Sequence, residues 1–129
     1  GRSSERYTQL EGESFNCGIE FTLLAAPTKI ADGVFALKYS HRFTGEEPLA
    51  PSVNDFAEVL YVWFKDGKPI PGAESPSLRL SNLSVTDAGA YLGVVGVRER
   101  DSEPITVVAR VVLLTVVPRA DVSAVTPAH

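Results

Sequence analysis

Cysteine is nearly absent from this sequence. Cys17 is the only one among 129 residues, so no disulfide can form within the chain. The small disulfide-stapled scaffolds are thereby excluded, and the usual mark of an oxidising compartment is missing. A reducing compartment does not follow, because a chain of this length can bury a sufficient hydrophobic core without covalent cross-links.

The sequence also lacks a basic stripe and a long hydrophobic run. A net charge of −4 argues against a nucleic-acid partner, which would require clustered positive charge. No stretch reaches the roughly 18 uninterrupted apolar residues of a membrane span. No apolar segment follows the N-terminal GRSSER, so we expect no signal peptide. The abrupt start suggests a domain cut from a longer precursor.

Motifs typical of catalytic, metal-binding or phosphate-binding sites are absent as well. The two histidines, His41 and His129, have no spacing that brings them together, and Cys and His are too few for a zinc site. The sequence contains no calcium-binding loop, no Gly-x-Ser-x-Gly elbow and no phosphate-binding glycine loop. We therefore expect no enzyme activity, no metal and no cofactor.

What the sequence does contain is period-two alternation. From Ser14 to Leu23 every second residue is apolar, which is typical of a strand with one buried face, and Cys17 lies on that face. Glu58 to Lys65 is a predicted strand with apolar residues on both parities, Trp63 among them, and is followed by Asp66-Gly67, a pair typical of a tight hairpin. Further strands are predicted at 33–43, 68–71, 78–80, 91–97 and 105–117.

Residues 57–117 resemble the tandem immunoglobulin-like modules of bacterial surface and secreted proteins. The motifs that carry the resemblance are Tyr61-Val62-Trp63-Phe64-Lys65-Asp66-Gly67, Pro69-Ile70-Pro71-Gly72-Ala73, Leu78-Arg79-Leu80-Ser81-Asn82 and Asp87-Ala88-Gly89-Ala90-Tyr91. The resemblance, to an I-set-like domain, implies an all-β fold: an immunoglobulin-like Greek-key β-sandwich. In disulfide-bonded members of the family a Cys follows the corner Tyr by two residues, and here that position is Gly93.

The resemblance also assigns structural roles to the conspicuous residues. Trp63 is expected to fill the space between the sheets, and Tyr91 to tie a corner to upstream backbone through its hydroxyl. Asp87 is expected to accept hydrogen bonds within its loop and not to act as an acid. The predicted structural core comprises Cys17, Trp63, Leu80, Asp87, Gly89 and Tyr91.

One domain with extensions is expected from the length and punctuation of the chain. Residues 1–6 are predicted to be a disordered tail, 7–117 the domain, and 118–129 a Pro- and Ala-containing linker or tail. Residues 24–56 exceed the segment that normally separates strands B and C of this fold. We interpret them as an insertion of one strand, 33–43, followed by an acidic loop.

The predicted last strand, Ile105 to Val117, is apolar on both faces. Its residues divide into Val107, Ala109, Val111 and Leu113 on one face and Val108, Val112, Leu114 and Val116 on the other. A strand with one face in water should carry polar residues there. We therefore expect the second face to be covered by the inserted strand, by a neighbouring domain or by a second copy in a homodimer.

The insertion and the charged loop 98–104 form the predicted recognition region, because binding residues concentrate on loops held by a rigid scaffold. The candidate binding residues mix aromatic and charged groups: Tyr39, His41, Arg42, Phe43, Glu46, Glu47, Arg98 and Arg100. We expect a non-catalytic binding or adhesion module of a bacterial extracellular or cell-surface protein, with a protein or glycan partner and neighbouring domains in the same polypeptide. A spacer in a multidomain secreted enzyme and an intracellular disulfide-free immunoglobulin domain are the alternatives.

Overall fold

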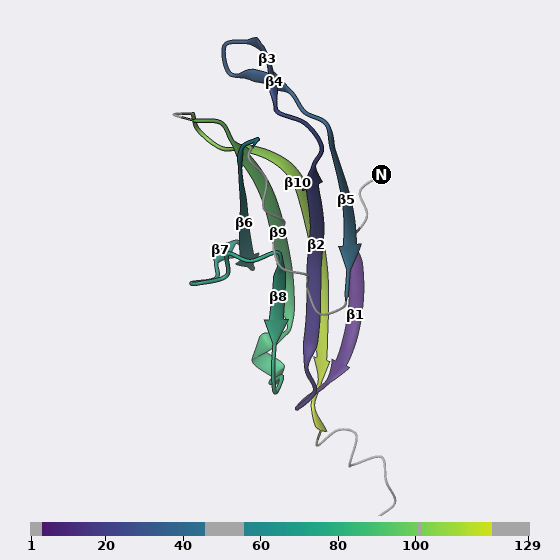
Figure 1. The fold of residues 1–129 in the computed structure, drawn as a ribbon. Helices are drawn as coiled ribbons and strands as arrows, with labels where there is room; N and C mark the ends of the chain where they lie inside the picture. The colour runs from purple at the N-terminus through teal and green to yellow at the C-terminus, as the bar shows by residue number, and fades with distance from the viewer. Residues whose placement is uncertain (1–3, 46–55, 101, 120–129) are drawn as a thin grey trace, which may run out of the picture.

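A computed structural model of the chain describes residues 4–45, 56–100 and 102–119 (Figure 1). The elements are β1 (Glu5–Leu10), β2 (Phe15–Leu23), β3 (Thr28–Ala31), β4 (Val34–Ala36), β5 (Tyr39–Thr44), β6 (Glu58–Lys65), β7 (Lys68–Pro69), β8 (Ser77–Leu80), the 3-10 helix η1 (Val85–Asp87), β9 (Gly89–Arg98) and β10 (Ile105–Val117). No helix among the described residues is long and apolar enough to cross a membrane.

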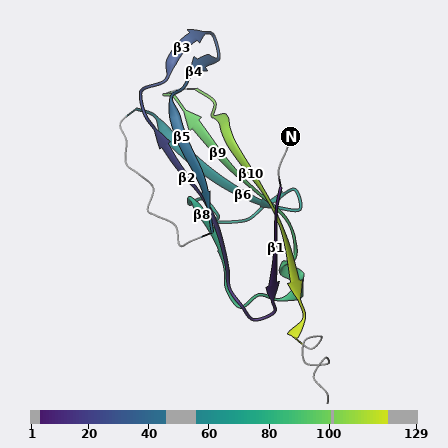
Figure 2. The same ribbon diagram turned by 90° about the vertical axis from the view of Figure 1, so that its right-hand side faces the viewer.

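Two sheets packed face to face make up the body of the molecule (Figures 1 and 2). One has the strand order β1-β10-β9-β6-β7, and the other has the order β5-β2-β8. Neighbouring strands are antiparallel except for β1 and β10, which run parallel. The chain is therefore an all-β, immunoglobulin-like sandwich, as the sequence predicts.

The core lies between the two sheets, where the alternating apolar residues of each strand meet. The alternation in β2 buries Phe15, Cys17, Ile19, Phe21 and Leu23, as its pattern predicts. The facing sheet buries a second set, which is made up of Tyr61, Trp63, Tyr91, Val95, Val97, Val108, Val112, Leu114 and Val116. Leu78 of β8 and Leu83 after it complete the core. From Val108 onward β10 follows the predicted division, with its even-numbered residues pointing inward. Val107 departs from it, because it lies at a register shift and packs against the core.

Trp63 occupies the space that a second cysteine would need. Its ring is buried, and its indole N–H donates a hydrogen bond to the Ser75 carbonyl oxygen at 3.0 Å. A Cβ atom added to Gly93 would lie 2.4 Å from the Trp63 ring, far inside van der Waals contact. Glycine at this position is therefore a consequence of how Trp63 packs. Cys17 remains free and buried.

The corner before β9 is closed by side chains that reach back to the backbone. The Tyr91 hydroxyl donates to the Asp87 carbonyl oxygen at 2.5 Å, and the Asp87 carboxylate accepts the Ser84 N–H at 2.8 Å. Gly89 has a φ of +155°, and a Cβ there would lie 2.8 Å from the Asp66 carboxylate. Burial raises the pKa of Tyr91 to about 12.

Among the other predicted core positions, Leu80, Asp87 and Gly89 are only partly buried.

The insertion contains three strands where the sequence analysis expected one. The predicted strand 33–43 is split, because β4 pairs with β3 in a separate hairpin and β5 pairs with β2. β5 is a member of the three-stranded sheet and does not cover the solvent-facing side of β10. The expectation that the inserted strand covers this side of β10 is therefore wrong. The remainder of the insertion, 46–55, lies outside the described residues.

An unpredicted strand, β1, opens the described chain. It takes in Glu5 and Arg6, which the sequence analysis assigned to the tail. In Figures 1 and 2, β1 lies beside the lower half of β10, while β5 lies beside the upper half of β2. The two strands thus follow one another along the same side of the sandwich.

Candidate functional site

The solvent side of the five-stranded sheet is apolar over its three central strands, whereas the edge strand β1 exposes Arg6 and Thr8 there. The apolar side chains alternate with the buried ones of β6, β9 and β10, and they form what we call the outer face: Leu60, Val62, Phe64, Leu92, Val94, Ala109, Val111 and Leu113. The strand register sets these residues in continuous rows. Val94 lies between Val62 and Ala109, and Leu92 lies between Phe64 and Val111. Val62 and Val111 are 37% and 38% exposed, respectively.

The other sheet has the opposite character on its solvent side. Its register places polar residues beside one another there, and they are Asn16, Glu20, Thr22, Ser40, Arg42, Ser77 and Arg79. Glu20 and Arg42 form an ion pair at 2.8 Å. This is the polarity expected of a sheet with one solvated face. The apolar outer face is therefore a local feature and not a general property of the chain's strands.

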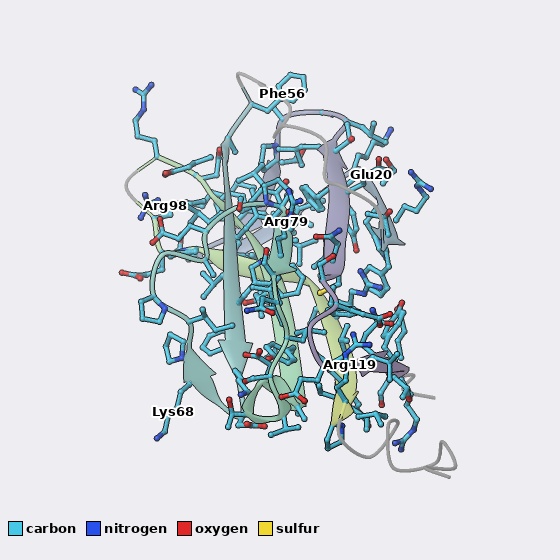
Figure 3. The ribbon with its side chains drawn as sticks, turned by 90° about the horizontal axis from the view of Figure 1, so that it is seen from below. Glu20, Phe56, Lys68, Arg79, Arg98 and Arg119 are labelled. Atoms are coloured by element: carbon cyan, nitrogen blue, oxygen red, sulfur yellow. The ribbon has the colours of Figure 1, made fainter. Side chains whose placement is uncertain are left out.

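A single ion pair bounds the outer face at one end. Arg98, at the end of β9, contacts the Glu58 carboxylate of β6 at 2.5 Å, and both side chains are substantially exposed. Figure 3 shows Arg98 and Glu20 on opposite sides of the molecule, in keeping with their different sheets. The sequence analysis singled out Arg98 and Arg100 for binding. The structure places Arg98 at the edge of the outer face and Arg100 exposed in the loop after β9.

Three of the predicted binding residues form an aromatic row along β5. Tyr39, His41 and Phe43 share one side of the strand, with ring centroids 6.0 Å and 5.5 Å apart. Phe21 of β2 stacks on Tyr39 at 5.4 Å and supports the row. Arg42 points to the opposite side, where it pairs with Glu20. Glu46 and Glu47 lie outside the described residues, so the structure brings together only the aromatic members of the predicted group.

Arg110 joins four strands at the point where β1 and β5 meet. It is 2% exposed. One guanidinium nitrogen donates to the carbonyl oxygens of Gly18 and Thr44 at 2.6 Å and 2.7 Å. The other donates to the Glu5 carboxylate at 2.5 Å and to the Tyr7 hydroxyl oxygen at 3.2 Å. The guanidinium also lies 5.1 Å from the centre of the Phe43 ring, a cation–π arrangement.

The pKa values of three groups near Arg110 differ from their ordinary values. Burial acts to raise the pKa of the Glu5 carboxyl, but the hydrogen bonds from Arg110 and Tyr7 outweigh it, so this pKa lies below its ordinary value. The hydrogen bond to Glu5 raises the pKa of Tyr7. Burial raises the pKa of the nearby Cys17 thiol to about 11. These shifts describe a structural ion pair and a protonated, unreactive thiol.

The role of Arg110 was not predicted from the sequence, although one feature of the sequence points to it. Arg110 has the same parity as Val108 and Val112, which places it on the inward face of the last strand. A charge there is almost always paired. The partner, however, lies 105 positions away and could not be identified from local pattern.

The outer face and the aromatic row are two exposed surfaces that the structure brings together. The described residues contain no group of three or more His, Cys, Asp or Glu side chains that could hold a metal ion. Neither the outer face nor the aromatic row places a nucleophile beside a base. The arrangement supports association with another surface.

Solved structures similar in fold to this chain are immunoglobulin-type domains. Murine CRIg is 10% identical, matches 89% of this chain and 94% of its own, and has a TM-score of 0.42. The V domain of amphioxus IgVJ-C2 is 13% identical over 86% of this chain and 99% of that chain, with a TM-score of 0.40. DIP-gamma IG1+IG2 is 20% identical, with a TM-score of 0.40, and this chain matches 44% of its length. No family model and no curated protein matches the sequence.

Proposed function

We propose that this chain is a non-catalytic protein-binding module that docks a partner on the outer face of its five-stranded sheet. The observation that carries the proposal is the contrast between the two sheets. One has a polar solvent side, whereas the other presents uninterrupted apolar rows on three neighbouring strands. Neighbouring strands are about 4.8 Å apart, so the rows span a patch of roughly a few hundred Å², the size at which an exposed apolar surface marks an interface.

The chemistry of the outer face favours a protein partner over a glycan. The eight side chains are hydrocarbon, and the charged groups that border them are the paired Glu58 and Arg98 and, beside Leu113, Arg6 of β1. A sugar would leave its hydroxyl groups without hydrogen-bond partners on such a surface. Another protein could supply an equally apolar surface, and a homodimer through β10 is one candidate. From the motif resemblance, we place the module in a bacterial extracellular or cell-surface protein.

Site-specific photo-crosslinking in the full-length protein tests the proposal. A photoreactive amino acid replaces Val62 on the outer face, and a matched control replaces Thr22, which is exposed on the polar side of the other sheet. We expect a discrete protein adduct from position 62 and none from position 22. The absence of an adduct at 62 would contradict the proposal and favour the spacer function. Equal labelling at both positions would show only non-specific contact.

The aromatic row on β5 supports a second candidate for the recognition surface. Tyr39 and Phe43 are both exposed large aromatic residues, a type enriched at interfaces. The same crosslinking experiment with the photoreactive residue at position 41 tests this surface. An adduct at 41 with none at 62 would move the interface from the outer face to β5.

A further inference from the structure

The β3–β4 hairpin projects from one end of the sandwich and exposes apolar side chains. Its two strands pair only with each other, and all their residues except Phe35 are exposed. Figures 1 and 2 show it beyond the end of both sheets, opposite the end where β10 finishes. The described large hydrophobic residues with the greatest exposed fractions are Ile30 at 66%, Leu24 at 56% and Val34 at 50%. All three lie on this hairpin or at its base.

The hairpin thus combines two features that are unfavourable in isolation. A lone two-stranded hairpin is only marginally stable in water. Exposed Ile30 and Val34 add apolar surface at the most remote point of the molecule. Docking against an apolar surface would offset both costs, because it removes the side chains from water and holds the two strands in place.

The outer face of another copy matches the hairpin in polarity, size and charge. Two strands are about 5 Å wide, and the three strands that form the outer face span about 10 Å, so the hairpin fits across them. Neither contact centre carries a charge. The Lys29–Asp32 ion pair borders the hairpin, and the Glu58–Arg98 ion pair and Arg6 of β1 border the face, so opposite charges can meet at the edge of the contact.

We infer that the hairpin of one molecule docks on the outer face of a second copy. The inference rests on the proposed function, since it names the partner of the same face. The two surfaces are different parts of the chain, so the contact is head-to-tail and leaves a free hairpin at one end and a free face at the other. Such a contact adds further copies in a row and does not stop at a dimer.

The contact is small, so it operates at high local concentration. A hairpin of this size buries less than the roughly 1,200 Å² of a stable interface, which puts the contact among weak, transient ones. Copies arrayed on one surface, or repeated along one polypeptide, would reach such effective concentrations.

Sedimentation velocity up to about 1 mM tests the inference with neutral substitutions. The hairpin variant is Ile30→Gln/Val34→Gln, the face variant is Val62→Gln/Val111→Gln, and the matched control is Thr22→Gln/Ser40→Gln on the polar side of the other sheet. All the replaced side chains are exposed, so circular dichroism should show an unchanged fold. We expect the wild type and the control to associate beyond the dimer, and each of the other variants to stay monomeric alone.

Mixing the two monomeric variants gives the decisive result. The hairpin variant retains an intact face and the face variant retains an intact hairpin, so an equimolar mixture should form a dimer and stop there. A wild type that stops at a dimer, a mixture that stays monomeric, or a wild type that is monomeric at 1 mM would each overturn the inference. These outcomes are separate from failure of the proposed function, which crosslinking at position 62 in the full-length protein decides.

Discussion

At the scale of single residues, Arg110 keeps its charge inside the sandwich because four acceptor groups surround it. Two are carbonyl oxygens of other strands, and the others are the Glu5 carboxylate and the Tyr7 hydroxyl. Its Nε atom has no partner among the described groups. Desolvating a guanidinium is costly, so this ion pair contributes mainly by avoiding an unpaired buried charge. Removing the Glu5 carboxylate should therefore lower the free energy of unfolding by more than the ion pair contributes to it, because Arg110 would stay buried without its charged partner.

Replacing Glu5 with Gln should lower the free energy of unfolding by about 2 kcal/mol. The usual cost of breaking a fully buried pair is roughly 3–5 kcal/mol, and a third of the Glu5 side chain is exposed, which reduces it. Glu58→Gln is the matched control, because it breaks the exposed pair with Arg98 and should cost less than about 1 kcal/mol. Urea melts measure both. Equal effects would show that Arg110 does not depend on Glu5.

The same pair predicts how stability changes with pH. The pKa of Glu5 is lower in the folded chain than in the unfolded chain, where it is about 4.3, so the unfolded state takes up the proton first. The contribution of Glu5 is therefore complete above about pH 4.3 and is lost as the pH falls through the folded-state value. Melts of the wild type and Glu5→Gln should differ at pH 7 and converge in acid. A constant difference down to pH 2 would contradict the assignment.

Gly93→Ala should destabilise the domain by about 1–3 kcal/mol, because the added methyl group overlaps the buried Trp63 ring. Gly96→Ala on the same strand is the control. A Cβ at Gly96 meets its nearest atom at 3.4 Å, an ordinary contact, so we expect a smaller loss. Chemical denaturation separates the two. A neutral Gly93→Ala would mean that Trp63 can move aside.

At the scale of elements, the β3–β4 hairpin differs from every other pair of strands in the described chain. It belongs to neither packed sheet, and it exposes its side chains on both sides. Leu37, just after it, packs against the core, and the Leu24 N–H donates to the Lys38 carbonyl oxygen at 2.8 Å. The base of the hairpin is thus anchored to the sandwich, whereas the hairpin itself buries little apolar surface.

Replacing residues 28–36 with a short Gly-Ser turn should leave the melting temperature of the monomer within about 2 °C of the wild type. The reason is that almost no apolar surface of the hairpin is buried, and small changes in free energy shift the midpoint by only a few degrees. Differential scanning calorimetry at low concentration measures it. A collapse of the transition would instead make the hairpin part of the folding core.

The sequence predicted those elements whose signal is local. β2 alternates in polarity, β6 and β10 are largely apolar runs, and the Asp66-Gly67 turn has the positive φ values that a tight hairpin requires. β1 escaped prediction because its inward residues, Glu5, Tyr7 and Gln9, are polar. The insertion was misread because the predicted strand 33–43 joins two separate strands: β4 pairs locally with β3 across Asp32-Gly33, whereas β5 pairs with the distant β2. Pairing of β5 with β2 cannot be deduced from β5 alone.

The candidate site was predicted only in part, because the strand order brings together residues that are distant in the sequence. The apolar outer side of β10 was visible in its composition, since no polar residue balances Val107, Ala109, Val111 and Leu113. The contributions of β6 and β9 to the same face depend on the strand order. No local pattern indicates that Arg98 pairs with Glu58, because the two residues lie on different strands.

At the scale of the whole molecule, stability comes from a core without covalent cross-links. Cys17 is fully buried, and burial raises the pKa of its thiol to about 11. The thiol is therefore both inaccessible and protonated near neutral pH. Nothing in the described chain provides it with a disulfide partner.

Reducing agent should therefore have no effect on folding. We expect equal melting temperatures with and without dithiothreitol, and thiol reagents should label Cys17 only after unfolding. Labelling of the wild type in urea serves as the positive control. A large drop in melting temperature on reduction would reveal a disulfide between chains, and rapid labelling of the native protein would contradict the burial of Cys17.

The pairing of β1 with β10 has a consequence for how the protein is made. The first described strand completes its sheet only against the last, and Glu5 waits for Arg110. A ribosome releases the chain from its N-terminus at about 5–20 residues per second, so β1 emerges several seconds before its partner. During that interval the half-made sandwich carries an unpaired strand and an incomplete core. The domain can close only after β10 has left the ribosome, so folding of this sandwich cannot be completed while its strands are still emerging.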